Sequence, residues 1–300
     1  MSGPKTVTQL LDLAERVLSD SSHIFEDHDN RHEAEELLAF CLETEIDALD
    51  DEVIPPTRTR DRFLALVTRR AGGEPFPHLT GSIEFYGLRL EVRPGPFVPR
   101  PSSELTVERA ARRLRRRNDP VVVDVCAGAG PIALAIADEF PDAEVWGADI
   151  DAGGLALGRR NARRLGIDNV TFRTSDMYGA LPARLKGRVD VITGHIPYVA
   201  ANEVEDLPSE VREYEPLFTL SDSSSDGLDL IRRATQEAPA WLKPGGWLMM
   251  EISEDLGKKV TRICKQAGFG HIGVASDEDE LSVVIEAQLP RTVRAGLRNP

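Results

Sequence analysis

The sequence predicts an α/β fold in which a mostly parallel sheet, covered by helices, follows a small helical domain. Three observations support this prediction. Over residues 6–70 the apolar residues recur at helical spacing. From residue 121 onward, short β-branched runs alternate with helix-like segments, an order that builds a parallel sheet. A proline-rich stretch at residues 94–101 separates the two patterns, and a length of 300 residues is typical of two domains.

The first part of the chain, residues 1–80, is predicted to be a helical bundle. Its apolar positions share helix faces, as in Leu10, Leu13, Ala14 and Val17 and again in Phe63, Leu64 and Val67. Polar residues near Asp61 are expected to open the last helix, and Gly72-Gly73 to close it. Apolar runs at 83–86 and 88–92 predict a hairpin. Residues 81–100 are therefore assigned to a hairpin and linker.

The second part, residues 101–290, is predicted to hold the parallel sheet. Strands are expected at 121–125, 144–149, 170–174, 189–193 and 247–252. Helices are expected at 131–140, from a cap at Asp151 to Gly166, and at 228–241, followed by a turn at 243–246. Residues 271–275 and 281–287 are expected to pair as an antiparallel hairpin at the sheet edge. The basic tail, residues 291–300, is expected to fray.

Composition narrows the classes of function. No apolar run approaches the roughly 20 residues that a membrane span needs, and the N-terminus lacks a signal-peptide pattern, which predicts a cytoplasmic protein. Cys41, Cys126 and Cys264 lack metal-site spacing, so we expect reduced thiols and no metal. A net charge of −14 disfavours nucleic acid as a partner. The arginine-rich segment 109–117 is either a solvated helix face or a docking patch for an acidic or RNA-containing partner.

A glycine-bearing loop, Asp124-Val-Cys126-Ala-Gly128-Ala-Gly130, lies between a predicted strand and a predicted helix. Such a loop lets backbone approach a ligand and offers the helix N-terminus to an anionic group. Asp149 ends the next strand, at the spacing where a carboxylate accepts both ribose hydroxyls. These residues alone leave open a nicotinamide cofactor, S-adenosylmethionine, or glycines that serve only tight packing.

A second candidate site, His195-Ile196-Pro197-Tyr198, follows the strand predicted at 189–193, where ligands of open α/β sheets collect. In this motif and in several other segments the chain resembles the HemK/PrmC family of protein-glutamine methyltransferases. Members of that family methylate the Gly-Gly-Gln loop glutamine of peptide chain release factors. The other segments are Arg69-Arg-Ala-Gly-Gly-Glu-Pro, Leu79-Thr-Gly-Ser-Ile-Glu-Phe-Tyr-Gly-Leu, Val98-Pro-Arg-Pro-Ser-Ser-Glu, Ser175-Asp176-Met177, Tyr214-Glu-Pro and Asp226-Gly-Leu-Asp.

The resemblance implies the class I S-adenosylmethionine methyltransferase fold, a Rossmann-like, mostly parallel seven-stranded sheet with an antiparallel terminal strand. It implies S-adenosylmethionine as the methyl donor and a release factor as protein substrate, recognised by the helical domain. Gly128 and Gly130 are expected to face the methionine part of the donor, and Asp149 its ribose. The full set of expected cofactor-binding residues is Phe97, Pro99, Asp124, Cys126, Gly128, Gly130, Asp149, Ile150, Asp176, Met177 and His195, with Asp176 and Met177 at the adenine.

The resemblance also implies the catalytic residues His195, Ile196, Pro197 and Tyr198, which align with the family's Asn-Pro-Pro-Tyr. In the family the asparagine oxygen and the next backbone carbonyl accept the two N–H groups of the target amide, and the tyrosine packs beside it. Ile196 keeps that carbonyl. Neutral His195 can accept one hydrogen bond, or it can act as a general base for a hydroxyl or amine acceptor.

The remaining departures and alternatives are as follows. Cys126 replaces a usual glycine, which is tolerable if its backbone angles are ordinary. Glu251 and Tyr214-Glu-Pro are expected to order loops. Three functions stay open: methylation of a protein glutamine, methyl transfer to a small molecule or another N or O acceptor, and a non-catalytic cofactor-binding paralogue. DNA methylation is disfavoured by the net charge of −14.

Overall fold

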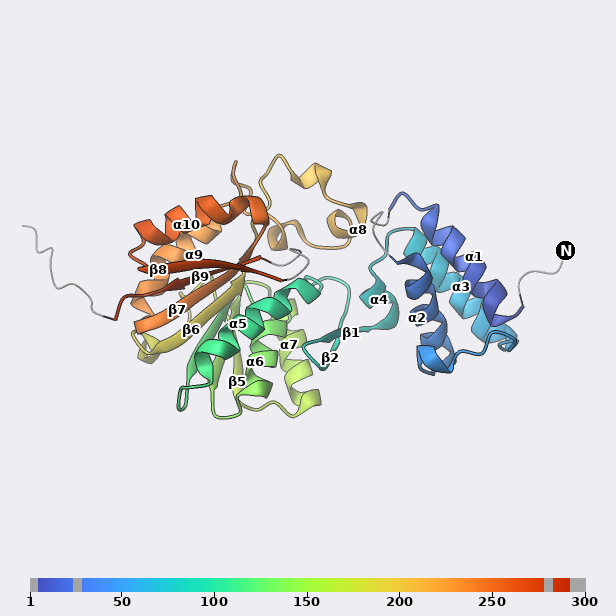
Figure 1. Ribbon diagram of the computed structural model, residues 1–300, viewed down its shortest axis with the longest axis horizontal. Coiled ribbons are helices and arrows are strands. Elements are labelled where there is room, and N and C mark those ends of the chain that lie inside the picture. Colours follow the sequence, from blue (N-terminus) through green and yellow to red (C-terminus); the bar gives the residue numbers. More distant parts are fainter. Residues whose placement is uncertain (1–4, 24–28, 278–282, 292–300) are drawn as a thin grey trace, which may run out of the picture. The chain divides into compact units, whose positions relative to one another are not determined.

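The computed structural model describes residues 5–23, 29–277 and 283–291 (Figure 1). It forms two compact units. The helical unit comprises Met1–Ser82, Val92–Pro94 and Glu205–Tyr214, and the sheet unit comprises Ile83–Glu91, Gly95–Val204 and Glu215–Pro300. The predicted fraying of the tail beyond residue 291 and the start of the predicted strand at Leu281 lie outside the described residues.

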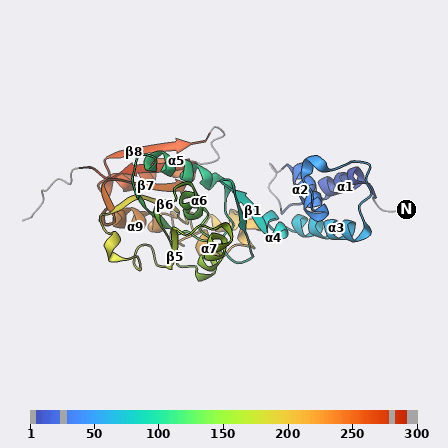
Figure 2. The same cartoon turned by 90° about the horizontal axis from the view of Figure 1, so that it is seen from below.

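The helical unit is built on α1 (Val7–Ser19), α2 (Asn30–Leu42) and α3 (Thr57–Ala71), followed by the short α4 (Phe76–Thr80) and joined by α8 (Ser209–Arg212). The first three helices lie side by side (Figure 2) and bury Leu10, Leu37 and Phe63 between them. The helix α3 begins before its predicted start at Asp61, because the Arg60 N–H already donates to the Pro56 carbonyl at 3.0 Å. Glycine closes this helix as predicted, with Gly72 as its cap.

The sheet unit contains a seven-stranded sheet in the order β5-β4-β3-β6-β7-β9-β8, which confirms the predicted fold class. The strands are β3 (Val121–Val125), β4 (Glu144–Asp149), β5 (Val170–Thr174), β6 (Val189–His195), β7 (Leu242–Ile252), β8 (His271–Ser276) and β9 (Val283–Gln288). Strands β3 to β7 run parallel, while β9 is antiparallel to both β7 and β8. Strand order reverses between β3 and β6, and ligands bind at such a switch point.

Helices cover both faces of this sheet (Figure 1). On one face lie α5 (Glu104–Leu114), α6 (Pro131–Glu139) and α7 (Ala152–Leu165), and on the other lie α9 (Asp229–Glu237) and α10 (Gly257–Gln266). Successive residues of β3 point to opposite faces of the sheet. Val122 therefore packs in the core beneath α5, α6 and α7, and Val123 in the core beneath α9 and α10. The predicted hairpin forms as β1 (Ser82–Phe85) and β2 (Leu88–Glu91).

Short 3₁₀ turns complete the connections: Ile46–Ala48, Pro101–Ser103, Ala183–Leu185, Val204–Asp206, Leu217–Thr219, Ala238–Ala240 and Glu254–Leu256. One of them ends α9 earlier than predicted, because Pro239 has no N–H to continue the helix. The predicted turn at 243–246 lies inside β7 as a bulge. Leu242 pairs with Val189 and Trp247 with Val191, so the residues between them are looped out of register.

The arginine-rich segment is largely paired within the sheet unit. Arg109 and Arg113 both contact Glu286, at 2.6 and 3.4 Å, and the Arg113 guanidinium lies 3.9 Å from the centre of the Trp247 ring. Further along the segment Arg117 faces Asp190 at 3.6 Å. These contacts favour the reading of a helix face held by acidic neighbours over that of a free docking patch. Among the described residues, no helix is long and apolar enough to cross a membrane.

Candidate functional site

A pocket of the sheet unit opens at the carboxyl ends of β3, β4 and β6. Of the residues expected to bind the donor, the structure places all but Gly130 in its lining: Phe97, Pro99, Asp124, Cys126, Gly128, Asp149, Ile150, Asp176, Met177 and His195. Of the expected catalytic residues, His195 and Pro197 line it. Ile196 is fully buried in the sheet's core, and Tyr198 packs against that core.

The glycine loop departs from expectation at two residues. Gly130 is not among the pocket's lining residues, and an added Cβ there would lie 2.3 Å from the Phe172 ring, so this glycine permits close packing. Cys126 does not have ordinary backbone angles, since its φ of 55° lies in the left-handed region that favours glycine. Burial raises the pKa of the Cys126 thiol well above its usual value, which argues against a thiolate nucleophile.

Asp124 places a buried carboxylate at the floor of the loop. The Thr193 hydroxyl donates to its Oδ1 at 2.8 Å, whereas Oδ2 has no hydrogen-bond partner among the residues that the structure describes. Burial raises the pKa of this carboxyl to about 7, against the lowering by Thr193. An orphaned buried oxygen beside a pocket is suited to a cationic ligand group such as an ammonium.

Asp149 lies at the end of β4, where it shapes the loop that it faces. Its Oδ2 accepts the Gly128 N–H and its Oδ1 accepts the Asp151 N–H, both at 2.7 Å. Burial nevertheless outweighs these hydrogen bonds and raises the pKa of Asp149. Each carboxylate oxygen keeps a further lone pair for a hydroxyl donor. The next residue, Ile150, is 56% exposed and offers an apolar surface in the same pocket.

The loop after β5 contributes the third part of the pocket. Ser175 turns the chain, since its hydroxyl donates to the Met177 carbonyl at 2.8 Å and accepts the Ala180 N–H at 2.9 Å. Met177 is buried, whereas Asp176 is exposed and pairs with Arg233 at 2.7 Å. The apolar Met177 side chain suits the face of a purine ring, and the Asp176 carboxylate beside it suits the purine's amino group.

His195, at the end of β6, lies in a cluster that the sequence did not predict. Glu251 is its register partner on β7 and is buried. The Ser102 and Ser103 hydroxyls donate to Glu251 at 2.7 and 2.5 Å, and His195 Nδ1 lies 3.2 Å from Ser103 Oγ and 3.4 Å from Glu251 Oε2. The Ser103 hydroxyl donates its only hydrogen to Glu251, so it can only accept from His195. We therefore assign the proton of neutral His195 to Nδ1. Nε2 then carries the free lone pair.

His195 is enclosed by aromatic neighbours, and burial favours its neutral form. The ring stacks on Tyr198 with centroids 5.8 Å apart and meets Phe97 edge-on at 5.3 Å. Burial lowers the pKa of His195, and Arg100 lowers it further, while Glu251 acts in the opposite direction. Burial also raises the pKa of Tyr198 to about 12, so its phenol stays protonated.

Several lining residues escaped the sequence analysis, namely Ser103, Phe218, Thr219 and Leu230. Glu251 was expected only to order a loop. A charged residue ending the buried strand 247–252 was the available signal for its role. Phe218 and Thr219 carry no such signal, because they lie on a long connection whose path depends on tertiary contacts, and Leu230 is an ordinary apolar residue of the first turn of α9.

The residues present fit S-adenosylmethionine better than a dinucleotide. The pocket holds the carboxylates of Asp124, Asp149, Asp151 and Asp176, which would repel a pyrophosphate. Arg100, the arginine that lines the pocket, pairs with Glu215 at 2.5 Å. A donor that carries an ammonium, a sulfonium and a ribose diol matches this charge. The open choice between a nicotinamide cofactor and S-adenosylmethionine is thereby decided for the latter.

Comparison with known proteins gives a consistent result. Residues 117–288 match the family described as "Methyltransferase domain". Curated relatives named release factor glutamine methyltransferase include one from Burkholderia pseudomallei, 37% identical over 77% of this chain and 81% of that protein. Another, from Geobacter sulfurreducens, is 37% identical over 75% of this chain and 76% of its own length.

Solved structures share the fold. A methyltransferase from Pyrococcus furiosus superposes with a TM-score of 0.51 over 78% of this chain and all of that one, at 16% sequence identity. A 16S rRNA N2 G1207 methyltransferase from T. thermophilus, solved with AdoMet and guanosine, gives a TM-score of 0.51 over 69% of this chain and 49% of that one, at 19% identity. At these identities the likeness concerns the architecture of the sheet unit.

Proposed function

Because the chain belongs to the release factor glutamine methyltransferase family, whose members are S-adenosylmethionine-dependent enzymes, we propose that it methylates a glutamine side-chain amide of a release factor. The observation that carries the proposal is the neutral His195, held with Nδ1 toward Ser103 and Glu251 in a pocket suited to the donor. Its Nε2 would supply the hydrogen-bond acceptor that the asparagine side-chain oxygen supplies in the family.

The donor-binding residues divide by chemistry. Asp124 Oδ2 would accept from the ammonium of the methionine part, and Asp149 from the ribose hydroxyls. Met177 and Ile150 would cover the adenine ring. Bound S-adenosylmethionine supplies a methyl group activated by its sulfonium, so that a C–N bond to the amide forms as the S–C bond breaks.

On the acceptor side, His195 Nε2 would accept one N–H of the glutamine amide and the Ile196 carbonyl the other. An amide nitrogen is a weak nucleophile, so catalysis rests on alignment and on acceptors that stabilise positive charge developing there. His195 differs from asparagine in being able to take the proton that the methylated nitrogen releases. Glu251, 3.4 Å from Nδ1, would stabilise the resulting imidazolium.

A second candidate reaction is methyl transfer to a hydroxyl or amine of a small molecule. The contact between His195 and Glu251 favours it, because a carboxylate-backed imidazole is a general base for such acceptors. The helical unit distinguishes the two reactions. We assign recognition of the protein substrate to residues 1–80 and the catalytic reaction to residues 101–290. This assignment predicts that release-factor methylation needs the helical unit, whereas methylation of a small molecule does not. We also assign a cytoplasmic location to the protein.

Mass spectrometry of a release factor incubated with the full chain and S-adenosylmethionine tests the proposal. We expect a single methyl group on the Gly-Gly-Gln glutamine and none on a release factor in which that glutamine is replaced. Absence of the methyl group, with donor binding shown in parallel by calorimetry, would refute it and favour a small acceptor. Donor binding without any methylated acceptor indicates the non-catalytic paralogue.

A further inference from the structure

A second site of the sheet unit, the basic hollow, lies at the end of α5. It is lined by five arginines, namely Arg112, Arg113, Arg116, Arg117 and Arg291, and by Trp247. Among the described residues that line it, none is an aspartate or a glutamate. The donor pocket has the opposite character, with four aspartates in its lining. The sheet unit therefore presents two sites of opposite charge, which suit different ligands.

The end of α5 supplies three of the arginines. Arg116 lies four positions after Arg112 and three after Arg113, a spacing that places the three on one side of the helix end. Stacking orients Arg113, because its guanidinium lies 3.9 Å from the centre of the Trp247 ring. The basic hollow thus contains a guanidinium that is already oriented, which lowers the entropic cost of binding a ligand there.

The chain after β9 supplies Arg291. The Gly245 N–H donates to the Leu289 carbonyl at 2.9 Å, which holds the bulge of β7 against this chain. Gly245 has a φ of 81°, and an added Cβ there would lie 3.0 Å from Arg291 Cγ. The glycine therefore lets Arg291 lie across the bulge, where it lines the same hollow as Arg116.

Two buried carboxylates offset only part of the positive charge. Glu286 pairs with Arg113 and with a second arginine of α5. Asp190 lies 3.6 Å from Arg117 and also contacts Lys243. Each carboxylate thus faces two cationic groups and can neutralise only one of them. The two clusters leave two positive charges in excess.

Two further arginines are not paired. Among the residues that the structure describes, no ion pair or hydrogen bond reaches the side chains of Arg116 and Arg291, and both residues are exposed. Arg112 pairs with the exposed Glu108, so this pair adds no net charge. Together with the charges left beside the two buried carboxylates, the excess around the basic hollow is four positive charges.

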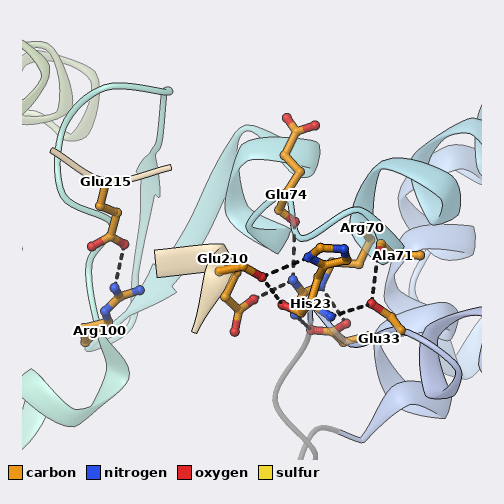
Figure 3. A network of polar contacts seen from close by, with 10 residues as sticks. His23, Glu33, Arg70, Ala71, Glu74, Arg100, Glu210 and Glu215 are labelled. Atoms are coloured by element: carbon orange, nitrogen blue, oxygen red, sulfur yellow. Dashed lines mark hydrogen bonds and ion pairs between the residues drawn. The ribbon is translucent and has the colours of Figure 1, made fainter. Parts of the chain in front are cut away.

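An arginine of the helical unit has a different environment. Arg70 is almost completely buried, and its guanidinium donates to both Glu33 oxygens of α2, at 2.9 and 3.1 Å, and to Glu210 Oε2 of α8, at 2.6 Å (Figure 3). Two carboxylates there face one guanidinium, the reverse of the ratio in the basic hollow. Arg70 is neutralised, as a buried structural charge must be, whereas Arg116 and Arg291 are neither neutralised nor buried.

We propose that the basic hollow binds an oligophosphate group of two or three phosphates. Guanidinium groups match phosphate oxygens with paired hydrogen bonds, and such a group carries roughly three to four negative charges, close to the local excess. A nucleic acid would extend beyond the hollow onto a chain whose net charge is −14. An acidic peptide brings one charge per side chain and has to order each of them. A compact oligophosphate avoids both costs.

The basic hollow lies at the edge of the sheet opposite the donor pocket. Asp190, which faces Arg117, accepts the N–H of Val121, the first residue of β3, at 3.1 Å. The donor pocket opens at the carboxyl ends of the same strands. An oligophosphate in the hollow would not contact S-adenosylmethionine, so this inference does not rest on the proposed methyl transfer.

Calorimetry with inorganic tripolyphosphate tests the proposal. The full chain is saturated with S-adenosylmethionine in magnesium-free buffer, so that the donor pocket is filled. For Arg116→Gln and for Arg291→Gln we expect the Kd for tripolyphosphate to rise about tenfold, because each change removes one charge-assisted contact. Arg163→Gln, the same change at an exposed arginine near the end of α7, should leave the Kd within about twofold of wild type.

Further ligands identify what carries the oligophosphate. CTP that binds as tightly as tripolyphosphate indicates a free oligophosphate, and CTP that binds more tightly indicates a nucleotide; both results support the proposal if the two variants weaken them. Absence of tripolyphosphate binding, or an equal loss in Arg163→Gln, would overturn it. An RNA oligonucleotide or a poly-glutamate peptide that binds through the same arginines about tenfold more tightly than tripolyphosphate would also overturn it, and would assign the hollow to that macromolecule.

Discussion

The two sides of the pocket are built in different ways. The donor side consists of the ends of adjacent strands and the short loops after them: Asp149 accepts from Gly128 and Asp151, and Asp124 accepts from Thr193 on the neighbouring strand β6. The acceptor side joins His195 to Ser103 and Glu251, which come from distant parts of the chain. The proposed donor side therefore follows from the succession of strands, loops and helices and from the pairing of adjacent strands, whereas the proposed acceptor side also needs Ser102 and Ser103, which precede α5, to meet β6 and β7.

The strongest test of this division is His195→Ala. We expect kcat to fall by about 10² to 10³-fold, because an acceptor for the amide N–H and for its proton is lost. The Kd for S-adenosylmethionine should change by less than about threefold, since the donor side is untouched. His271→Ala, on an exposed edge strand, is the control. Equal loss of turnover and of donor affinity would place His195 on the donor side instead.

The next effect in size is that of Glu251→Gln, for which we expect about a tenfold loss in kcat/KM. Burial lowers the pKa of His195 and the charge of Glu251 opposes that lowering, so the variant should lower the pKa further. His195 acts in its neutral form, so activity is lost as pH falls through this pKa. The acid limb of the kcat/KM profile should therefore move to lower pH. An acid limb that stays in place, as expected for the exposed control Glu254→Gln, would limit Glu251 to a structural role.

On the donor side, Asp124→Asn should weaken S-adenosylmethionine binding about tenfold at pH 8, measured by calorimetry. Burial raises the pKa of Asp124 to about 7, well above its value in an unfolded chain, so the ligand-free protein loses stability as pH rises from about 4 to 7. Above pH 7 the buried charge remains, and the variant should unfold at a higher temperature than wild type. Asp142→Asn, an exposed change in the same unit, should alter neither property.

The same contrast explains how far sequence reasoning reached. Periodicity predicted the strands and helices, because backbone pairing and apolar burial follow local patterns, and Asp149 followed from its spacing after the glycine loop. The Ser103–Glu251 and Arg70–Glu210 contacts join residues 148 and 140 positions apart, and no local pattern indicates them. The φ of 55° at Cys126 and the Phe172 ring beside Gly130 are properties of the folded loop, which the sequence pattern does not indicate.

The smallest effect concerns the glycine loop itself. Cys126 and Gly128 both have left-handed backbone angles, with φ of 55° and 53°. Such angles cost a residue with a Cβ about 1 kcal/mol, and loss of the partly buried thiol offsets part of the gain, so Cys126→Gly should raise the free energy of unfolding by about 0.5 kcal/mol. Gly128→Ala should lower it by about 1 kcal/mol, although an added Cβ meets no atom within 4 Å. Trp146, Trp241 and Trp247 all lie in the sheet unit, so tryptophan fluorescence in urea reports its unfolding. Changes of the same sign in both variants would show that side-chain packing, and not backbone conformation, sets the stability of this loop.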